Sequence, residues 1–197
     1  MDIKAAEKFM EKLVKAGMEY GFEECEASFA QDSSMSIDIL KGEVSSYENS
    51  VTSTLSFRGL KNGQMGYCST NILNDDSIDF LLKSAMENCE VLNDEDPQFI
   101  YCDENNKDLY FSQTTEAFAK NTYKKFEELG LGLEQAILAL DERIDAVDIL
   151  SINCGTGPFL IINSKGLHSY RDTDGISLVA SGRAIDVIGI SSFVCSL

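Results

Sequence analysis

The single imidazole of the chain, His168, is the natural starting point for any hydrolytic chemistry. Zinc and iron sites need several His, Cys or carboxylate ligands brought together, often at helical or turn spacing. No acidic or sulfur ligand stands at such a spacing from His168, so local motifs do not complete a metal centre. We interpret His168, which follows Asn163-Ser164-Lys165-Gly166, as an exposed or half-exposed strand residue rather than a ligand or general base. No catalytic, cofactor-binding or metal-binding residue is predicted.

Two further motifs superficially match ligand-binding loops. Asp172-Thr173-Asp174-Gly175 is similar to the opening of a calcium loop, but the twelfth position is Arg183 where a bidentate Glu is needed. We interpret it as a hairpin turn. Gly155-Thr156-Gly157-Pro158 lacks the third glycine and the following helix of a phosphate site, which favours a tight turn between strands. Cys68 has no base nearby in sequence that would make it a nucleophile.

Charge and cysteine usage narrow the class of protein. With 16 basic and 33 acidic residues the formal charge is −17, which disfavours nucleic-acid binding but permits a basic partner or a cationic peptide. No apolar run reaches membrane-spanning length, and the first residues alternate in charge, so we expect a cytoplasmic protein without membrane contact. The cysteines form no C-x-x-C pair, and we expect reduced thiols, several of them in the core: Cys25, Cys68, Cys89, Cys102, Cys154 and Cys195.

The first ninety residues predict a helix, a meander of strands and a second helix. Apolar residues recur at helical spacing from Asp2 to Tyr20, and Gly21 is a plausible stop. Period-two alternation then indicates antiparallel strands, with a turn at residues 40–43 and a type I′ hairpin turn at Asn62-Gly63. A helix is expected to start near Asp75 or Asp76, either of which could cap it.

The second half returns to strands after a helical stretch. Residues 93–106 are acidic and read as a surface connection with a short extended piece at 99–102. Helices are expected over 115–129 and from Leu133, unless Gly130 and Gly132 kink one helix. The strands predicted after them cover residues 147–154, 159–163, 176–183 and 184–190. The expected fold class is α+β, with a mixed, largely antiparallel sheet and flanking helices.

Domain organisation leaves two alternatives open. Residues 1–197 form one domain, or two subdomains at 1–92 and 107–197 joined by the acidic connection. The apolar stretch from Ile185 to Leu197 continues to the last residue, so we expect a truncated chain whose carboxyl-terminal domain is missing.

The order of these segments resembles the TldD/PmbA family, described as modulators of DNA gyrase and grouped with zinc peptidases. The resemblance rests on residues 24–27, on 37–44, on the hairpin 55–70 followed by a helix with Ala85 in its middle, and on the Asn-Ser-x-Gly turn at Asn163. Gly66-Tyr67-Cys68-Ser69-Thr70 favours the PmbA (TldE) branch. The chain would then be the amino-terminal domain of a longer protein.

The resemblance implies a division of labour between subunits. In the TldD branch an H-E-x-x-x-H helix holds the catalytic zinc, and that motif is absent from this chain. We therefore expect a metal-free, peptide-framing part that is inactive alone, with zinc in a TldD-like partner and an unfolded peptide or small protein as substrate. The dimer would form with that TldD-like subunit or with a second copy of the chain. DNA gyrase regulation would be an indirect result of proteolysis. The alternative is a non-catalytic protein-binding module.

Overall fold

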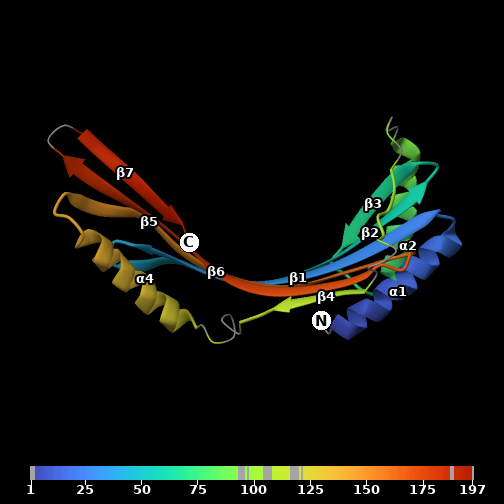
Figure 1. Ribbon diagram of the computed structural model, residues 1–197, viewed down its shortest axis with the longest axis horizontal. Helices are drawn as coiled ribbons and strands as arrows, with labels where there is room; N and C mark the ends of the chain where they lie inside the picture. Colours follow the sequence, from blue (N-terminus) through green and yellow to red (C-terminus); the bar gives the residue numbers. More distant parts are fainter. Residues whose placement is uncertain are drawn as a thin grey trace. The chain divides into compact units, whose positions relative to one another are not determined.

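The chain folds into helices packed on a largely antiparallel sheet (Figure 1). The computed structural model describes residues 3–92, 96, 98–103, 108–115, 120, 122–186 and 189–196, with side chains as far as Ile185. The elements are α1 (Ile3–Tyr20), β1 (Glu24–Leu40), β2 (Glu43–Lys61), β3 (Gln64–Thr70), α2 (Asp75–Val91), β4 (Asp108–Gln113), α4 (Tyr123–Leu138), β5 (Ile144–Asn163), β6 (His168–Asp186) and β7 (Gly189–Ser196). Strand order is β3-β2-β1-β5-β6-β4, with β7 also paired to β6. The predicted α+β class is confirmed.

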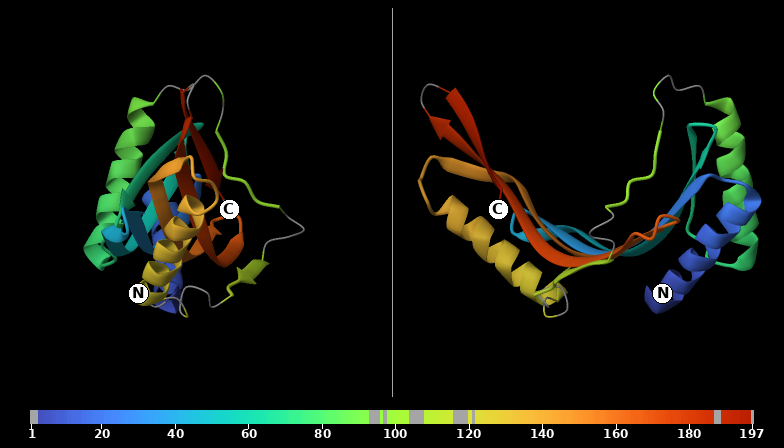
Figure 2. Two further views of the ribbon diagram at one scale, coloured as in Figure 1. Left: turned by 90° about the vertical axis from the view of Figure 1, so that its left-hand side faces the viewer. Right: turned by 45° about the vertical axis from the view of Figure 1, so that its right-hand side comes forward.

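The first of two compact units, unit 1, comprises Met1–Asp32, Thr52–Ser112 and Gly157–Asp172. Helices α1 and α2 lie on the same side of its strands (Figure 2). Alternate residues of β1, β2 and β5 point to these helices, as strand geometry requires, and join one apolar core. That core contains Ala6, Met10, Leu13, Phe22, Cys25, Ala27, Phe29, Leu55, Phe57, Leu81, Ala85, Leu160 and Ile162.

The second unit, unit 2, comprises Ser33–Val51, Gln113–Thr156 and Thr173–Leu197. Its only long helix among the described residues is α4, which packs Phe126 and Ile137 against strand residues. The strand side of this core consists of Met35, Ile37, Ile39, Val147, Leu150, Ile152, Cys154 and Ala180. Strands β1, β2, β5 and β6 contribute residues to both units.

Two predicted hairpin turns are confirmed. Lys41 and Gly42 have φ of 55° and 78°, and Asn62 and Gly63 have φ of 52° and 76°, as a two-residue type I′ turn requires. Lys61 pairs with Gln64 across the second turn. The positive φ values of both turns explain why each ends in glycine.

The strands are longer than predicted, and the turns expected inside them are wrong. Residues 155–158 lie within β5, and residues 172–175 lie within β6. Gly157 is needed for close approach, because a Cβ there would collide with the carbonyl oxygen of Gln31 on β1. Asp174 accepts hydrogen bonds from the backbone and hydroxyl of Thr115 instead of shaping a turn. Glycine and aspartate therefore stand within these strands for reasons other than chain reversal.

The helix boundaries correct three further predictions. Asn74, and neither Asp75 nor Asp76, caps α2 by accepting the N–H of Ser77 at 2.9 Å. Thr115 itself is not helical and α4 begins at Tyr123, while residues 116–119 and 121 of the helix predicted over 115–129 lie outside the described residues. Helix α4 then continues through both glycines, which confirms the alternative of a single helix. None of the described helices is long and apolar enough to cross a membrane.

Candidate functional site

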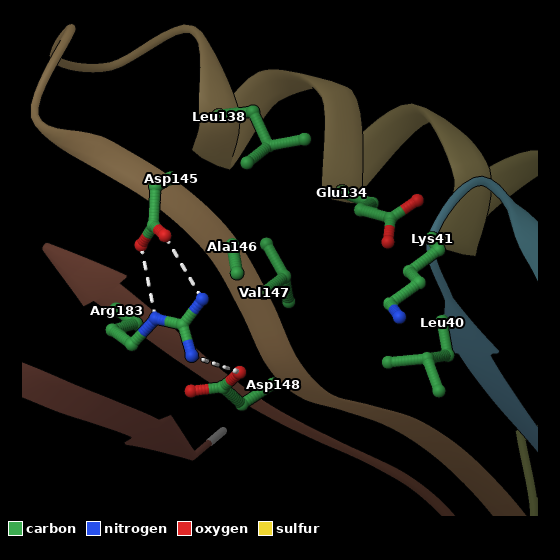
Figure 3. A pocket seen from close by; sticks show the side chains of 9 residues that line it. All are labelled: Leu40, Lys41, Glu134, Leu138, Asp145, Ala146, Val147, Asp148 and Arg183. Carbon is green, nitrogen blue, oxygen red and sulfur yellow. Dashed lines mark hydrogen bonds and ion pairs between the residues drawn. The ribbon is translucent and has the colours of Figure 1, made fainter.

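An open pocket of about 400 Å³ in unit 2 lies where α4 meets the β1–β2 turn and strands β5 and β6 (Figure 3). Its apolar part comes from Leu40, Leu138, Ala146 and Val147, and its charged part from Lys41, Glu134, Asp145, Asp148 and Arg183. Glu134 is 3% exposed, and its carboxylate accepts the N–H of Gly42 at 2.7 Å. This helix carboxylate therefore fastens the β1–β2 turn to α4.

Arg183 is held by two aspartates of β5. Its Nε and Nη2 donate to Asp145 at 3.0 and 2.9 Å, and its Nη1 lies 3.9 Å from Asp148 (Figure 3). The hydrogen bond from Arg183 lowers the pKa of Asp145, and the same bond raises the pKa of the arginine. Both partners are thus held charged, and the pocket lining includes no thiol, hydroxyl or imidazole that could act as a nucleophile or proton carrier.

A second hollow, of about 260 Å³, lies in unit 1 on the sheet face opposite α1 and α2. At its base is Glu26, a carboxylate only 5% exposed. Arg58 Nε and Nη2 donate to Glu26 Oε1 at 2.7 and 2.6 Å, and Asn163 Nδ2 donates to Oε2 at 3.4 Å. The buried carboxylate is therefore compensated from β2 and from the end of β5.

The turn after β5 is fixed mainly by Asn163 and Ser164. Asn163 Oδ1 accepts the backbone N–H groups of Lys165 and Leu167, both at 3.0 Å. Ser164 exchanges two hydrogen bonds with Cys25 of β1: the Cys25 N–H donates to Ser164 Oγ and the Ser164 N–H to the Cys25 carbonyl. Gly166 has φ of 92°, which favours glycine. The Asn-Ser-x-Gly motif is therefore a structural anchor.

The same turn holds the buried Ile100. Lys165 Nζ donates to the Ile100 carbonyl at 2.8 Å and to Glu24 at 2.7 Å, and Glu24 accepts the Ile100 N–H at 2.9 Å. Desolvation opposes ionisation of Glu24, but the hydrogen bonds from Lys165 and Ile100 outweigh it and lower the pKa of Glu24. Glu24 and Lys165 thus attach Ile100, which lies in the connection predicted at residues 93–106, to β1.

His168 lies at the start of β6, half-buried, with Nε2 2.7 Å from Glu7 Oε1 of α1. The predicted half-exposed strand residue is confirmed, and its partner is one that the sequence did not indicate. Within the described part of the chain, no three His, Cys, Asp or Glu side chains are placed to hold a metal ion. The zinc implied by the resemblance therefore does not fit any site among these residues.

The thiols divide into buried and accessible sets. Cys25, Cys89 and Cys154 are buried and unpaired, as the sequence predicted for core cysteines. Burial raises the pKa of Cys25 to about 12 and also raises the pKa of Cys89 and Cys154. Cys68 is half-buried on β3. None of the buried thiols is suited to nucleophilic chemistry, since the reactive form is the thiolate.

Residues 25–89, about a third of the chain, match the family model for PmbA/TldA metallopeptidase domain 1. Over these residues the chain is similar to the first domain of that family. The glycines of the matched TldD/PmbA hairpin have packing roles: Gly59 lies against Phe22, and a Cβ at Gly66 would collide with the Ala85 carbonyl of α2. No curated protein matches.

Three solved structures share the fold over almost the whole chain. A putative DNA gyrase modulator from Thermotoga maritima has TM-score 0.76 at 20% identity over 96% of this chain. TldE from Thermococcus kodakarensis has TM-score 0.77 at 13% identity over 95%. A putative DNA gyrase modulator from Bacteroides thetaiotaomicron has TM-score 0.75 at 19% identity over 96%. The chain spans 42% of the first two structures and 43% of the third.

Sequence reasoning missed the Glu26–Arg58–Asn163 group and the Glu134–Gly42 bond. The partners are separated by 32, 137 and 92 positions, so no local spacing links them. The one available signal in the sequence was Glu26, a carboxylate between the apolar residues Cys25 and Ala27 in a predicted strand.

Proposed function

We propose that this chain is the peptide-framing, metal-free part of a TldD/PmbA-type metallopeptidase complex that acts on unfolded peptides or small proteins. The observation that carries the proposal is the match of residues 25–89 to domain 1 of that metallopeptidase family. Zinc and its activated water would belong to a TldD-like partner. The chain would therefore be inactive alone.

The ligand inventory supports the metal-free assignment. The sequence contains one histidine, His168, and that side chain is engaged with Glu7 at 2.7 Å. A peptidase zinc site usually takes three protein ligands, and the described residues gather no such set. What the unit-1 sheet offers instead is a surface: a face free of α1 and α2, lined by polar and aromatic side chains. Such a face can contact an extended chain without cleaving it.

The branch and the cellular location belong to the same proposal. Gly66-Tyr67-Cys68-Ser69-Thr70 supports placement in the PmbA (TldE) branch, the branch without the zinc-binding helix. A chain of charge −17 whose buried cysteines are free fits the reducing cytoplasm.

Co-purification with a TldD-like subunit tests the proposal. The chain should be co-expressed with that subunit, and cleavage of an unfolded peptide should be followed with and without a zinc chelator. We expect chelator-sensitive cleavage by the pair, and none by the chain alone. The proposal is overturned if the chain alone cleaves the peptide or binds zinc stoichiometrically, or if no complex with a TldD-like subunit forms.

The second candidate is a non-catalytic protein-binding module. It is favoured by β4, a strand at the end of the strand order in which every residue from Asp108 to Gln113 is exposed, including Leu109, Tyr110 and Phe111. Exposed edge strands can pair with a partner chain. Stable binding of folded proteins by the chain alone, with no TldD-like subunit retained, would favour this function over the first.

A further inference from the structure

Arg58 lines a hollow on the unit-1 sheet face that α1 and α2 leave open, and Arg171 lies over Phe159, another residue of its lining. Four adjacent strands contribute in order: Arg58 from β2, Glu26 from β1, Phe159 from β5 and Arg171 from β6. Cys25, Ala27, Phe57 and Leu160 alternate with these residues and face the helices, which fixes the other set on the open face.

Arg58 is bound to Glu26 on its buried side and keeps further guanidinium N–H donors. Two of its five N–H groups donate to Glu26 Oε1, and Glu26 Oε2 is engaged by Asn163. The Arg58 side chain is 40% exposed while that of Glu26 is 6% exposed. Glu26 therefore orients the guanidinium from the buried side, and the remaining N–H groups have no protein partner among the described residues.

Arg171 is the arginine whose charge no carboxylate of the described residues neutralises. It is exposed, and its Cζ lies 6.0 Å from the ring centroid of Phe159. The two arginines of unit 2 differ, because Arg143 is bound to Asp141 and Arg183 to Asp145. Arg171 therefore lies beside Phe159, which lines the hollow together with Arg58.

The hollow has a mixed lining that suits a short polar side chain on an extended backbone. Ser28 and Phe159 line it together with Ile161, and Ser56 Oγ lies 3.1 Å from the Tyr67 hydroxyl. Hydroxyls and guanidinium N–H groups both donate to carboxylate oxygens. Aromatic and aliphatic neighbours lower the local dielectric and strengthen such bonds.

We propose that this hollow is a subsite for an acidic side chain, Asp or Glu, of an extended peptide, held by Arg58 and Arg171. The choice of a peptide rests on the proposed function, whereas the carboxylate preference rests on the two arginines. A side chain is favoured over a terminal carboxylate because the hollow lies on strand faces, whose backbone N–H groups serve the sheet, and terminal carboxylates are captured by free backbone N–H groups.

The charge of −17 does not prevent this recognition. At physiological ionic strength the screening length is about 8 Å, so distant acidic groups are largely screened. The charged residues that line the hollow are Arg58 and the nearly buried Glu26, and the Arg171 guanidinium lies beside Phe159 of the same lining. The local attraction between the arginines and an acidic side chain should therefore outweigh the repulsion from the net charge of the chain. We expect the site to affect which peptides bind more than the rate at which they associate.

Titration of the full 197-residue chain by two-dimensional NMR tests the subsite. The ligands are octapeptides of alternating Val and Thr with one central Glu, acetylated and amidated so that the side chain is the only carboxylate. We expect amide shifts centred on Ser28, Ser56, Arg58 and Phe159, and about tenfold weaker binding of the peptide in which Glu is replaced by Gln, the loss of one charge-assisted bond. A free carboxyl terminus should not restore affinity to the Gln peptide.

Matched variants separate charge recognition from folding. Arg171→Gln removes an exposed guanidinium and should fold normally, while abolishing most of the Glu-over-Gln preference. Glu26→Gln with Arg58→Gln removes the buried pair together and should also lose the preference. Lys83→Gln on α2 deletes a positive charge of the same unit, paired at 3.9 Å with Glu87, and should change nothing.

The inference is overturned if the Glu and Gln peptides bind equally, if Arg171→Gln behaves like Lys83→Gln, or if the shifts map away from the open face. Its fate is separable from that of the proposed function. Charge-selective binding by a chain that no TldD-like subunit accepts would leave the subsite standing without the peptidase role. Cleavage by the complex, with no preference between the two peptides, would support the peptidase role and overturn the subsite.

Discussion

Glu26 stands on β1 between two fully buried apolar residues, and its carboxylate is hydrogen-bonded by residues of other strands. A buried carboxylate without a partner costs several kcal/mol, whereas a paired and hydrogen-bonded one is tolerated. Arg58 and Asn163 supply that compensation from two other strands. The pairing of the strands in unit 1 is therefore supported by this polar group as well as by the alternation of apolar residues.

Arg58→Met should destabilise the chain because it leaves Glu26 buried and unpaired. We expect a loss of about 2 kcal/mol in the free energy of unfolding, below the range for fully buried pairs because Arg58 is partly exposed. Urea titration followed by circular dichroism measures it. Adding Glu26→Gln should recover at least half of the loss, since the amide still accepts from Asn163. A double variant no more stable than Arg58→Met would contradict this account.

Thiol reactivity should follow burial. At pH 8, iodoacetamide should label Cys68 in the native protein long before Cys25, because burial raises the pKa of Cys25 to about 12 and keeps its thiol neutral. Neutrality of Cys25 favours the folded state below pH 9, the ordinary value, and this contribution is lost as pH rises toward 12. Peptide mass spectrometry after timed labelling measures the order. Equal rates for the two cysteines without denaturant would show that the core opens locally.

At the scale of elements, two glycines in α4 have opposite structural roles. A Cβ at Gly130 would lie 2.6 Å from Ile39 Cγ1 of β1, so glycine allows helix and strand to approach. A Cβ at Gly132 would meet nothing within 4 Å. The same residue type is thus required at one position and merely tolerated at the other.

The pair Gly130→Ala and Gly132→Ala tests this contrast on one helix. Gly130→Ala should lower stability by about 1 to 2 kcal/mol, the cost of overpacking less the gain in helix propensity. Gly132→Ala should raise stability by about 0.5 to 1 kcal/mol, because alanine restricts the unfolded chain and favours helix. Thermal and urea unfolding of both variants measure the difference. The assignment fails if both substitutions shift stability in the same direction.

At the scale of the whole molecule, each unit has its own apolar core, yet four strands supply residues to both cores. The same strands continue from one core into the other. When one core unfolds, we expect these strands to lose their pairing in the other core as well. We therefore expect a single cooperative transition rather than two independent ones.

Leu81→Ala in unit 1 and Phe126→Ala in unit 2 test this cooperativity. Each should cost about 2 to 5 kcal/mol through the cavity that it leaves. Hydrogen exchange with mass spectrometry should then show faster exchange in strand segments of both units, whichever core carries the substitution. Lys83→Gln on the surface should leave exchange unchanged. Acceleration confined to the substituted unit would show that the two cores unfold separately.

The sequence by itself determined the features that depend on near neighbours. Helical and strand periodicity indicated α1, α2 and parts of β1, β2, β3, β5 and β6, although not β4, and Asn62-Gly63 indicated a hairpin turn, because these signals arise within a few residues. The core cysteines and the α+β class followed from the same patterns. The family resemblance came from the order of such signals along the chain.

Only the tertiary structure decided which distant residues meet. Gly157 and Asp174 were mistaken for turn residues because glycine and aspartate favour turns locally, whereas contacts with Gln31 and Thr115 explain their places inside long strands. Glu26 contacts Arg58 because β2 lies beside β1. The alternation of residues along β1 does not by itself reveal which residue lies opposite Glu26. Cross-strand neighbours are set by sheet order and register, which the burial of whole faces determines and no short stretch of sequence encodes.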